Sequence, residues 1–167
     1  MSIAMEVRLL DQKTLGELCF SQQNCFWDQL TELGIASGIS QDLQGPITTK
    51  EKLIDSNHNL IIASTGDYIV GFLKYGIKKL YFYRNGSPVE YNPQCLLDFY
   101  VRESHQRQGV GQLLFNRLLQ VLSLSPVSLA YDRPSLKLLE FMKKHYNLDS
   151  PEIQPNRYTI YQGFLSS

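Results

Sequence analysis

The chain has 167 residues, a length typical of one domain, so we expect a single domain over residues 1–167. Its composition, 43% hydrophobic and 19% charged, excludes a mainly disordered chain. Sixteen Lys and Arg residues balance sixteen Asp and Glu residues, so no overall field draws the molecule to nucleic acid or acidic lipid. We therefore expect neither partner, and any electrostatic partner must meet a local patch.

The cysteines and the apolar stretches exclude two further classes. Cys19, Cys25 and Cys95 are too few for a disulfide framework, and no second Cys and His cluster offers a zinc site, so we expect a reducing, intracellular compartment and no metal. No uninterrupted apolar run approaches the roughly 18 residues of a membrane span. The sequence indicates a chain that is neither secreted nor membrane-spanning.

The first half of the chain predicts strands around one long helix. Apolar residues at helical spacing predict an amphipathic helix over about 23–43, with its end blurred by glycines. Strands are expected at 7–10, 60–64, 68–73 and 77–83. Thr65-Gly66-Asp67 is typical of a hairpin turn, and the polar, turn-rich stretch 84–94 predicts a loop.

The second half alternates strands and helices. Residues 94–101 (QCLLDFYV) predict a buried central strand, interrupted by Asp98, which we expect to be structural and paired with a backbone or basic group. Apolar residues at i, i+3, i+4, i+7 and i+11 from Gly111 predict a helix of about four turns.

A short strand at 127–131, a helix opened by Pro134 and a strand at 157–164 are expected to follow. The helix should bury Leu138, Phe141, Met142 and His145. This order predicts an α/β (α+β mixed) fold with a mixed sheet flanked by helices.

The segment Gln106 to Gly111 (QRQGVG) lies between the central strand and the long helix. The first turn of a helix leaves about four backbone N–H groups unpaired, which together with the helix dipole form an anion site. Glycines let a phosphate approach closely, and Arg102 and Arg107 are candidate partners for it. A glycine-rich turn without a ligand is the alternative.

This segment resembles the Q/R-x-x-G-x-G/A signature of the GNAT superfamily of acetyl-CoA-dependent acetyltransferases at Gln106, Gly109 and Gly111. Longer strings are similar to those of the α-tubulin N-acetyltransferases, at 95–100 (CLLDFY), 132–135 (DRPS) and 144–148 (KHYNL). The resemblance runs from about Leu30 to Phe164. It implies a GNAT fold with a central, mixed, splayed β-sheet flanked by helices, acetyl-CoA as co-substrate in the splay, and a lysine of α-tubulin on the luminal face of microtubules as acceptor.

The resemblance also implies which residues hold acetyl-CoA. In a splayed strand, exposed backbone N–H groups can bind the pantetheine amides and polarise the thioester carbonyl. The expected residues lie on the central strand, on the phosphate loop and at the start of the next helix: Phe99, Tyr100, Val101, Arg102, Gln106, Arg107, Gln108, Gly109, Val110, Gly111, Ser135 and Lys137. For Ser135 and Lys137 an ordinary helix N-terminus is the alternative.

Acetyl transfer to lysine requires the loss of a proton from an ammonium group whose ordinary pKa is about 10.4, so a base, a water path or a desolvated pocket is needed. Asp132 and Cys95 match residues proposed for this role in the family, and Gln41 matches one that helps to hold the active-site arrangement. A carboxyl of ordinary pKa about 3.9 is a poor base unless burial raises it, whereas a thiol near 8.5 is closer to the task. Alternatively, Asp132 orients the ammonium or caps a turn, and Cys95 is a small buried apolar residue.

A basic, aromatic hairpin is expected to meet the substrate. Lys74, Lys78 and Lys79 are interleaved with tyrosines, and such a patch in a neutral protein suits an acidic partner such as tubulin. A solvated strand face with edge lysines is the alternative. Arg133, in the DRPS string, is a further expected substrate contact.

Taken together, the resemblance implies an acetyl-CoA-dependent α-tubulin lysine N-acetyltransferase that works by direct attack in a ternary complex. We expect a monomer in the cytoplasm, on the microtubule cytoskeleton, with cilia or flagella as candidate sites. Two alternatives stay open: a GNAT enzyme acting on another protein or amine, and a catalytically weak tubulin-binding module.

Overall fold

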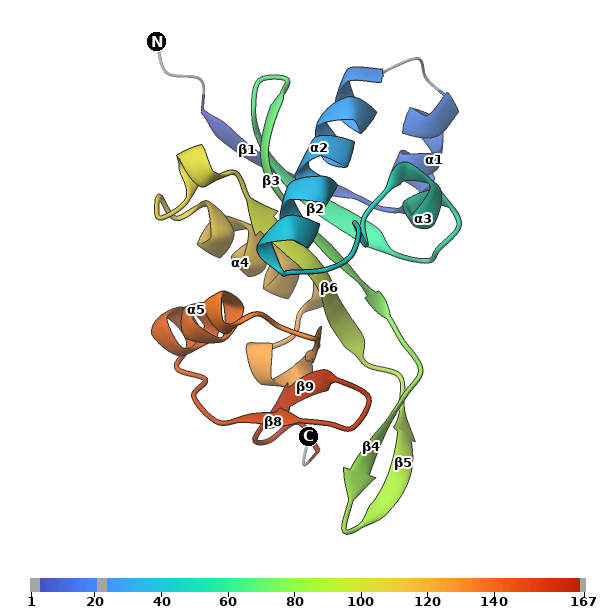
Figure 1. Ribbon diagram of the computed structural model, residues 1–167, viewed down its shortest axis with the longest axis vertical. Helices are drawn as coiled ribbons and strands as arrows, with labels where there is room; N and C mark the ends of the chain where they lie inside the picture. Colours follow the sequence, from blue (N-terminus) through green and yellow to red (C-terminus); the bar gives the residue numbers. More distant parts are fainter. Residues whose placement is uncertain (1–3, 21–23, 166–167) are drawn as a thin grey trace.

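In residues 4–20 and 24–165, which the computed structural model describes, seven strands form one sheet in the order β1-β2-β3-β6-β7-β9-β8 (Figure 1). These strands are β1 (Met5–Leu10), β2 (Asn59–Thr65), β3 (Tyr68–Ile77), β6 (Gln94–Val101), β7 (Ala130–Asp132), β8 (Pro151–Ile153) and β9 (Tyr158–Tyr161). A separate hairpin of β4 (Leu80–Arg84) and β5 (Ser87–Tyr91) projects from the body of the molecule. The helices are α1 (Gln12–Phe20), α2 (Asn24–Ser40), α3 (Lys50–Ile54), α4 (Val110–Leu122) and α5 (Leu136–Tyr146), with 3-10 turns η1 (Glu103–His105) and η2 (Pro126–Ser128).

Helices cover both faces of the sheet, and β2 shows the reason. Successive side chains of a strand point to opposite faces. Leu60 and Ile62 pack into the core formed with α1, α2 and α3, whereas Ile61 and Ala63 pack into the core formed with α4 and α5. All four are buried, so an unbroken apolar run builds two cores at once.

The glycines of α2 bring a neighbouring segment against the helix. The backbone oxygen of Thr48 lies where a Cβ of Gly34 would sit, and Gly45 and Pro46 lie 3.2 and 3.4 Å from the place of a Gly38 Cβ. These residues therefore keep segment 45–48 in contact with α2, which continues past both glycines to Ser40. We predicted that glycines blur the end of this helix; instead, two of them serve packing within it.

The sheet splays between its two central parallel strands. β6 pairs antiparallel with β3 along most of its length, but it pairs with β7 only at Cys95 with Ala130 and at Leu96 with Tyr131. Because β6 continues for five more residues, to Val101, its far half runs beyond this pairing. The expected mixed, splayed sheet flanked by helices is therefore confirmed, as are the central strand at 94–101 and the helix that follows it.

Some sequence predictions were wrong. The stretch 84–94, predicted as a loop, contains β5, and the strand predicted at 77–83 is divided between the end of β3 and β4. The stretch 127–131 is divided between η2 and β7. Helices α1 and α3 and strand β8 were not predicted, and Gln23, the expected start of the first long helix, lies outside the described residues.

Candidate active site

A cavity of about 650 Å³ opens where β6 and β7 diverge. That volume lies within the range of small-molecule sites. Its walls come from the end of α2, the far half of β6, the start of α4, the segment after β7 and one face of α5. The predicted residues that line it are Gln41, Phe99, Tyr100, Val101, Gln106, Arg107, Gly109, Gly111, Asp132, Ser135 and Lys137.

The start of α4 has the features of an anion site. Gly109 is the N-cap residue, with φ at +83°, and no heavy atom lies within 4 Å of the place where its Cβ would be. This left-handed backbone favours glycine, and the open space leaves the first-turn amides approachable. Arg107, also left-handed with φ at +62°, is exposed at the cavity wall.

Two other members of the loop point elsewhere. The side chain of Val110 is buried in the core beside α4, so only its backbone is available to a ligand. Gln108 donates from Nε2 to the backbone oxygen of Ser104 at 3.2 Å and does not line the cavity. The side chains of these two residues therefore do not line the cavity.

Gln106 joins the two walls of the cavity. Its Nε2 donates to the backbone oxygen of Val101, at the end of β6, at 2.7 Å. Its Oε1 accepts from Nζ of Lys137, in the first turn of α5, at 2.8 Å. Ser135 is the N-cap of α5, and its Oγ accepts from the backbone N–H of Leu138 at 3.2 Å, so the helix N-terminus considered as an alternative is present.

The side chain of Arg102 lies outside the cavity. Its Nε donates to the backbone oxygen of Ile69 at 2.6 Å, and its Nη1 pairs with Glu32 on α2 at 2.8 Å. Its guanidinium therefore contacts β3 and α2 rather than the phosphate loop, and the sequence did not indicate this direction. Only the backbone of Arg102 continues toward the loop.

Asp132 lines the cavity and is the last residue of β7. Its side chain is 17% exposed, and its Oδ1 accepts from Nε of Arg133 at 3.2 Å. Burial raises the pKa of the neighbouring Tyr158, and the charge of Asp132 raises it further. Its strand pairing places Asp132 directly opposite Tyr158. A carboxylate with open lone pairs thus faces the cavity.

Cys95 is fully buried and does not line the cavity. It packs with Phe82, Leu97 and Ala130, and its Sγ contacts the backbone oxygen of Pro93 at 3.5 Å. Burial raises the pKa of its thiol to about 12, and the charge of Asp132 adds to this. These surroundings agree with the alternative interpretation of Cys95 as a small buried apolar residue.

Gln41 acts on a second carboxylate rather than on Asp132. Asp98 is 4% exposed and accepts hydrogen bonds from Ser37 at 2.7 Å, from Gln41 at 3.1 Å and from Thr48 at 2.5 Å. The backbone N–H of Phe99 also donates to it, at 2.9 Å. This network ties α2 and segment 45–48 to β6. The backbone partner that we expected for Asp98 is therefore confirmed, and its other hydrogen-bond partners are neutral side chains.

Lys74 corrects the predicted basic hairpin. It is 5% exposed on β3, in register with Asp98, and its Nζ donates to the backbone oxygen of Ile47 at 2.6 Å. Burial lowers its pKa to about 8. Because an inaccessible side chain cannot touch a partner protein, Lys74 is not a docking residue.

The other predicted substrate residues lie at the surface. Lys79 is exposed and pairs with Glu90 across the β4–β5 hairpin at 3.1 Å, whereas Lys78 is partly buried before β4. Tyr81 and Tyr83 are exposed on β4. The hairpin is therefore aromatic at its surface, but part of its positive charge is already paired.

Several residues of the cavity were not predicted. They lie on α2, α4 and α5 and at the start of the segment after β7: Ser37, Ser40, Gln112, Pro134, Glu140, Phe141, Lys144 and His145. Those on α5 share one helical face with Lys137, at spacings of three or four residues. This periodicity was visible, but the sequence predicted Phe141 and His145 only as core residues.

In residues 4–20 and 24–165, no group of three or more His, Cys, Asp and Glu side chains could hold a metal ion. Over the same residues, every helix is too short or too polar to cross a membrane.

Comparison with known proteins places the chain. An α-tubulin N-acetyltransferase of Tetrahymena thermophila is 40% identical over 169 residues, covering 95% of this chain and 42% of the relative. α-Tubulin N-acetyltransferase 1 of Danio rerio is 41% identical over 145 residues, covering 83% of this chain and 49% of the relative. The chain thus spans less than half the length of these two curated relatives.

A solved structure supports the fold. A mutant of the AtaT toxin, bound to the C-terminus of the antitoxin AtaR and to acetyl-CoA, superposes with a TM-score of 0.62 at 14% identity. The match covers 97% of this chain and 94% of that chain. Residues 3–167 match the family described as GNAT acetyltransferase, Mec-17, and the chain therefore belongs to that family.

Proposed function

We propose that this chain transfers the acetyl group of acetyl-CoA to a lysine side chain of α-tubulin on the luminal face of microtubules. The observation that carries the proposal is a single cavity with an anion-binding helix start, at Gly109, in one wall and a partly exposed carboxylate, Asp132, in another. The names of the family and of the two relatives support acetyl transfer and the substrate.

The residues of the cavity fit acetyl-CoA. The first-turn amides of α4 and the side chain of Arg107 would hold the diphosphate, because they present donors and positive charge at an open surface. The far half of β6, from Phe99 to Val101, would hold the pantetheine arm along the splay. Lys137 would remain a link between Gln106 and α5.

When bound, acetyl-CoA supplies a thioester, and attack by a neutral lysine amine on its carbonyl carbon forms a C–N bond while the C–S bond breaks and the sulfur keeps the electron pair. Asp132 is the residue we propose to orient the incoming ammonium and to take its proton, directly or through one water. Cys95 is not proposed as the base, because its buried thiol has a raised pKa and no access to the cavity. The same burial favours direct attack in a ternary complex over an acyl-enzyme.

The proposed acceptor also suggests where the protein works. We propose that it acts as a monomer on microtubules, including those of cilia or flagella. The exposed surface of the β4–β5 hairpin, with Tyr81, Tyr83 and Lys79, is the proposed contact with tubulin. Arg133 is 45% exposed next to Asp132 and would meet the acceptor segment.

Mass-spectrometric mapping of acetylated lysines tests the proposed reaction. Assembled microtubules are incubated with the protein and acetyl-CoA, and we expect time-dependent acetylation of α-tubulin that Asp132→Asn slows by about two to four orders of magnitude. Acetylation of other proteins or of small amines, with tubulin unmodified, would favour a GNAT enzyme with another substrate. Binding to microtubules without acetylation would favour a binding module.

Gly109→Asp tests the cofactor site. An aspartate here would place a like charge at the diphosphate and force an unfavourable backbone at φ +83°, so we expect the acetyl-CoA Kd to rise at least about tenfold. Gly109→Ala is the matched control, because it adds the backbone cost without the charge. Equal affinity of wild type and Gly109→Asp, measured by calorimetric titration, would remove this loop from the proposed site.

A further inference from the structure

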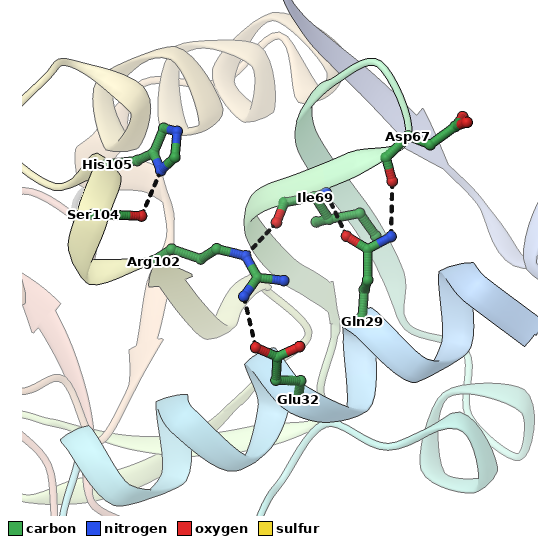
Figure 2. Close-up of polar contacts among 7 residues, drawn as sticks. All are labelled: Gln29, Glu32, Asp67, Ile69, Arg102, Ser104 and His105. Atoms are coloured by element: carbon green, nitrogen blue, oxygen red, sulfur yellow. Dashed lines mark hydrogen bonds and ion pairs between the residues drawn. The ribbon is translucent and has the colours of Figure 1, made fainter.

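Arg102 stands where β6 ends and the turn toward the phosphate loop begins, and Figure 2 shows its side chain reaching to β3 and α2. Its Nε donates to the backbone oxygen of Ile69 at 2.6 Å, and its Nη1 pairs with Glu32 at 2.8 Å. The guanidinium carbon lies 4.5 Å from the ring centre of Tyr68. The side chain of Arg102 is only 12% exposed, and its three contacts come from two elements, β3 and α2.

A second side chain, Gln29 of α2, also binds the backbone of Ile69. Gln29, one turn before Glu32, accepts from the backbone N–H of Ile69 at 2.7 Å and donates to the backbone oxygen of Asp67 at 2.7 Å (Figure 2). Gln29 therefore fastens α2 to β3 directly. Arg102 differs because it brings the end of β6 into the same junction.

The turn that follows Arg102 is hydrogen-bonded within itself. The backbone N–H of His105 donates to the oxygen of Arg102 at 2.9 Å, and Gln108 closes onto Ser104 at 3.2 Å. Gln106 donates back to Val101 at 2.7 Å. Turn 102–108 thus forms a connected unit directly before Gly109, and its orientation depends on where its ends are attached.

Two side chains attach this turn to other elements. Gln106 connects it to α5 through Lys137, and Arg102 connects it to α2 and β3. At its other end, α2 binds Asp98 of β6 through Ser37 and Gln41. The contacts of Arg102 therefore connect the start of this turn to the same helix whose end lines the cavity.

We propose that Arg102 is a positioning residue, which holds turn 102–108 against α2 and so sets where the first-turn amides of α4 meet the diphosphate of acetyl-CoA. This inference rests on the proposed function. A guanidinium serves two separate acceptors at once, Ile69 and Glu32, which one ammonium group does not reproduce. Its Nη2 is buried without a partner in the part of the chain that the structure describes. A buried donor without a partner lowers stability, so we infer that Arg102 serves the position of the turn rather than maximal stability.

The test compares variants at the two α2 junctions. We expect Arg102→Met and Arg102→Lys to raise the acetyl-CoA Kd about tenfold, with kcat at saturating acetyl-CoA changed less than about threefold, because misplaced amides weaken binding before they affect the reacting atoms. Glu32→Gln keeps an acceptor but not the charge, so its effect should be smaller, about threefold in Kd. Calorimetric titration and steady-state kinetics give these values.

Gln29→Met is the matched control. It removes two hydrogen bonds from the α2–β3 junction without touching turn 102–108, so it should lower the thermal midpoint and leave the acetyl-CoA Kd within about twofold of wild type. If Arg102→Lys lowers the midpoint similarly with an unchanged Kd, Arg102 is merely structural and the inference is wrong. An equal rise in Kd for Gln29→Met would assign the effect to α2 docking instead. Failure of the wild type to bind acetyl-CoA would overturn the proposed function itself.

Discussion

Asp98 and Asp132 stand on neighbouring strands and line the same cavity, but their surroundings are opposite. Asp98 is 4% exposed and accepts from four donors on β6, α2 and segment 45–48. Asp132 is 17% exposed, and Arg133, its neighbour in the chain, is the side chain that bonds it among the described residues. A carboxylate that already accepts four hydrogen bonds holds elements together, whereas one that accepts a single bond from its chain neighbour has room to bind a cation or a proton.

The local sequence produces this difference. Asp98 lies within a buried strand, where a bare charge is costly, so its donors must be carried in from elsewhere; the close approach at Gly34 places Thr48 beside it. Asp132 ends β7 instead, and Arg133 follows with φ at +40°, turning the chain into α5 at the cavity edge. Position along the strand separates the two roles.

Asp132→Asn should give the largest effect. The change is isosteric and removes the charge that we propose to receive the lysine proton, so we expect kcat to fall by about two to four orders of magnitude. The acetyl-CoA Kd should stay within about twofold, because Asp132 lies away from Gly109. Kinetics on tubulin and calorimetry check both values. A parallel loss of affinity would mean that the residue shapes the cofactor site instead.

Asp98→Asn should show the converse pattern. An amide cannot accept from all four donors and loses its charge opposite Lys74, so the free energy of unfolding should fall by about 3 kcal/mol. We expect kcat to drop less than about tenfold at a temperature where the variant is folded. Urea denaturation of this variant and of Asp132→Asn provides the comparison. If Asp98→Asn unfolds like wild type yet is inactive, the assignment of the two carboxylates is reversed.

Much of this site could be predicted, because its main parts are local in sequence. The periodicity of 110–122 and the apolar run 94–101 specify α4 and β6 in their own residues, and QRQGVG marks the helix start between them. The role of Asp98 also followed from one local fact, a charge inside a strand. The family resemblance supplied Asp132, which chemistry alone left ambiguous.

The parts that were missed depend on contacts between distant residues. The direction of Arg102 is set by Glu32, seventy positions earlier, and by Ile69. Lys74 looked like a surface cation because it follows the expected strand 68–73 and is followed by Lys78 and Lys79, but Ile47 and Asp98 enclose it. Strand β5 has four exposed residues, one of which is Pro88, and it forms only because β4 pairs with it. Local pattern holds no information on such partners.

Lys74→Met tests the closed environment of Asp98, because Lys74 is buried opposite it on β3. The folded pKa of Lys74, about 8, lies below the ordinary value of 10.5, so between these limits the unfolded chain binds more protons and stability rises with pH. The contribution of Lys74 to the free energy of unfolding is full above about pH 10.5 and is lost as the pH falls through 8. Between pH 8 and about pH 9.5 we expect roughly 2 kcal/mol of this rise to disappear in Lys74→Met.

Urea denaturation across this pH range measures the slope. Lys79→Met is the matched control, because Lys79 is exposed and its pKa is raised by Glu90, the opposite direction. Its removal should leave the rise in place. Parallel pH curves for wild type and Lys74→Met would show that the amine is hydrated in solution, and the closed environment assigned to Asp98 would then be wrong.

Cys95→Ser should have the smallest effect. It tests whether the thiol of Cys95 acts as a base together with Asp132. With a pKa of about 12, only about one thiol in ten thousand is ionised at pH 8, and the side chain does not reach the cavity. Serine keeps the size and the contact with Pro93 but cannot act as a base near neutral pH. We therefore expect kcat to fall no more than about fivefold through altered packing beside Leu97, and the midpoint of its pH profile to stay unchanged.

A loss as large as that of Asp132→Asn, in a variant of wild-type stability, would show that the thiol becomes accessible during turnover and that the carboxylate does not work alone.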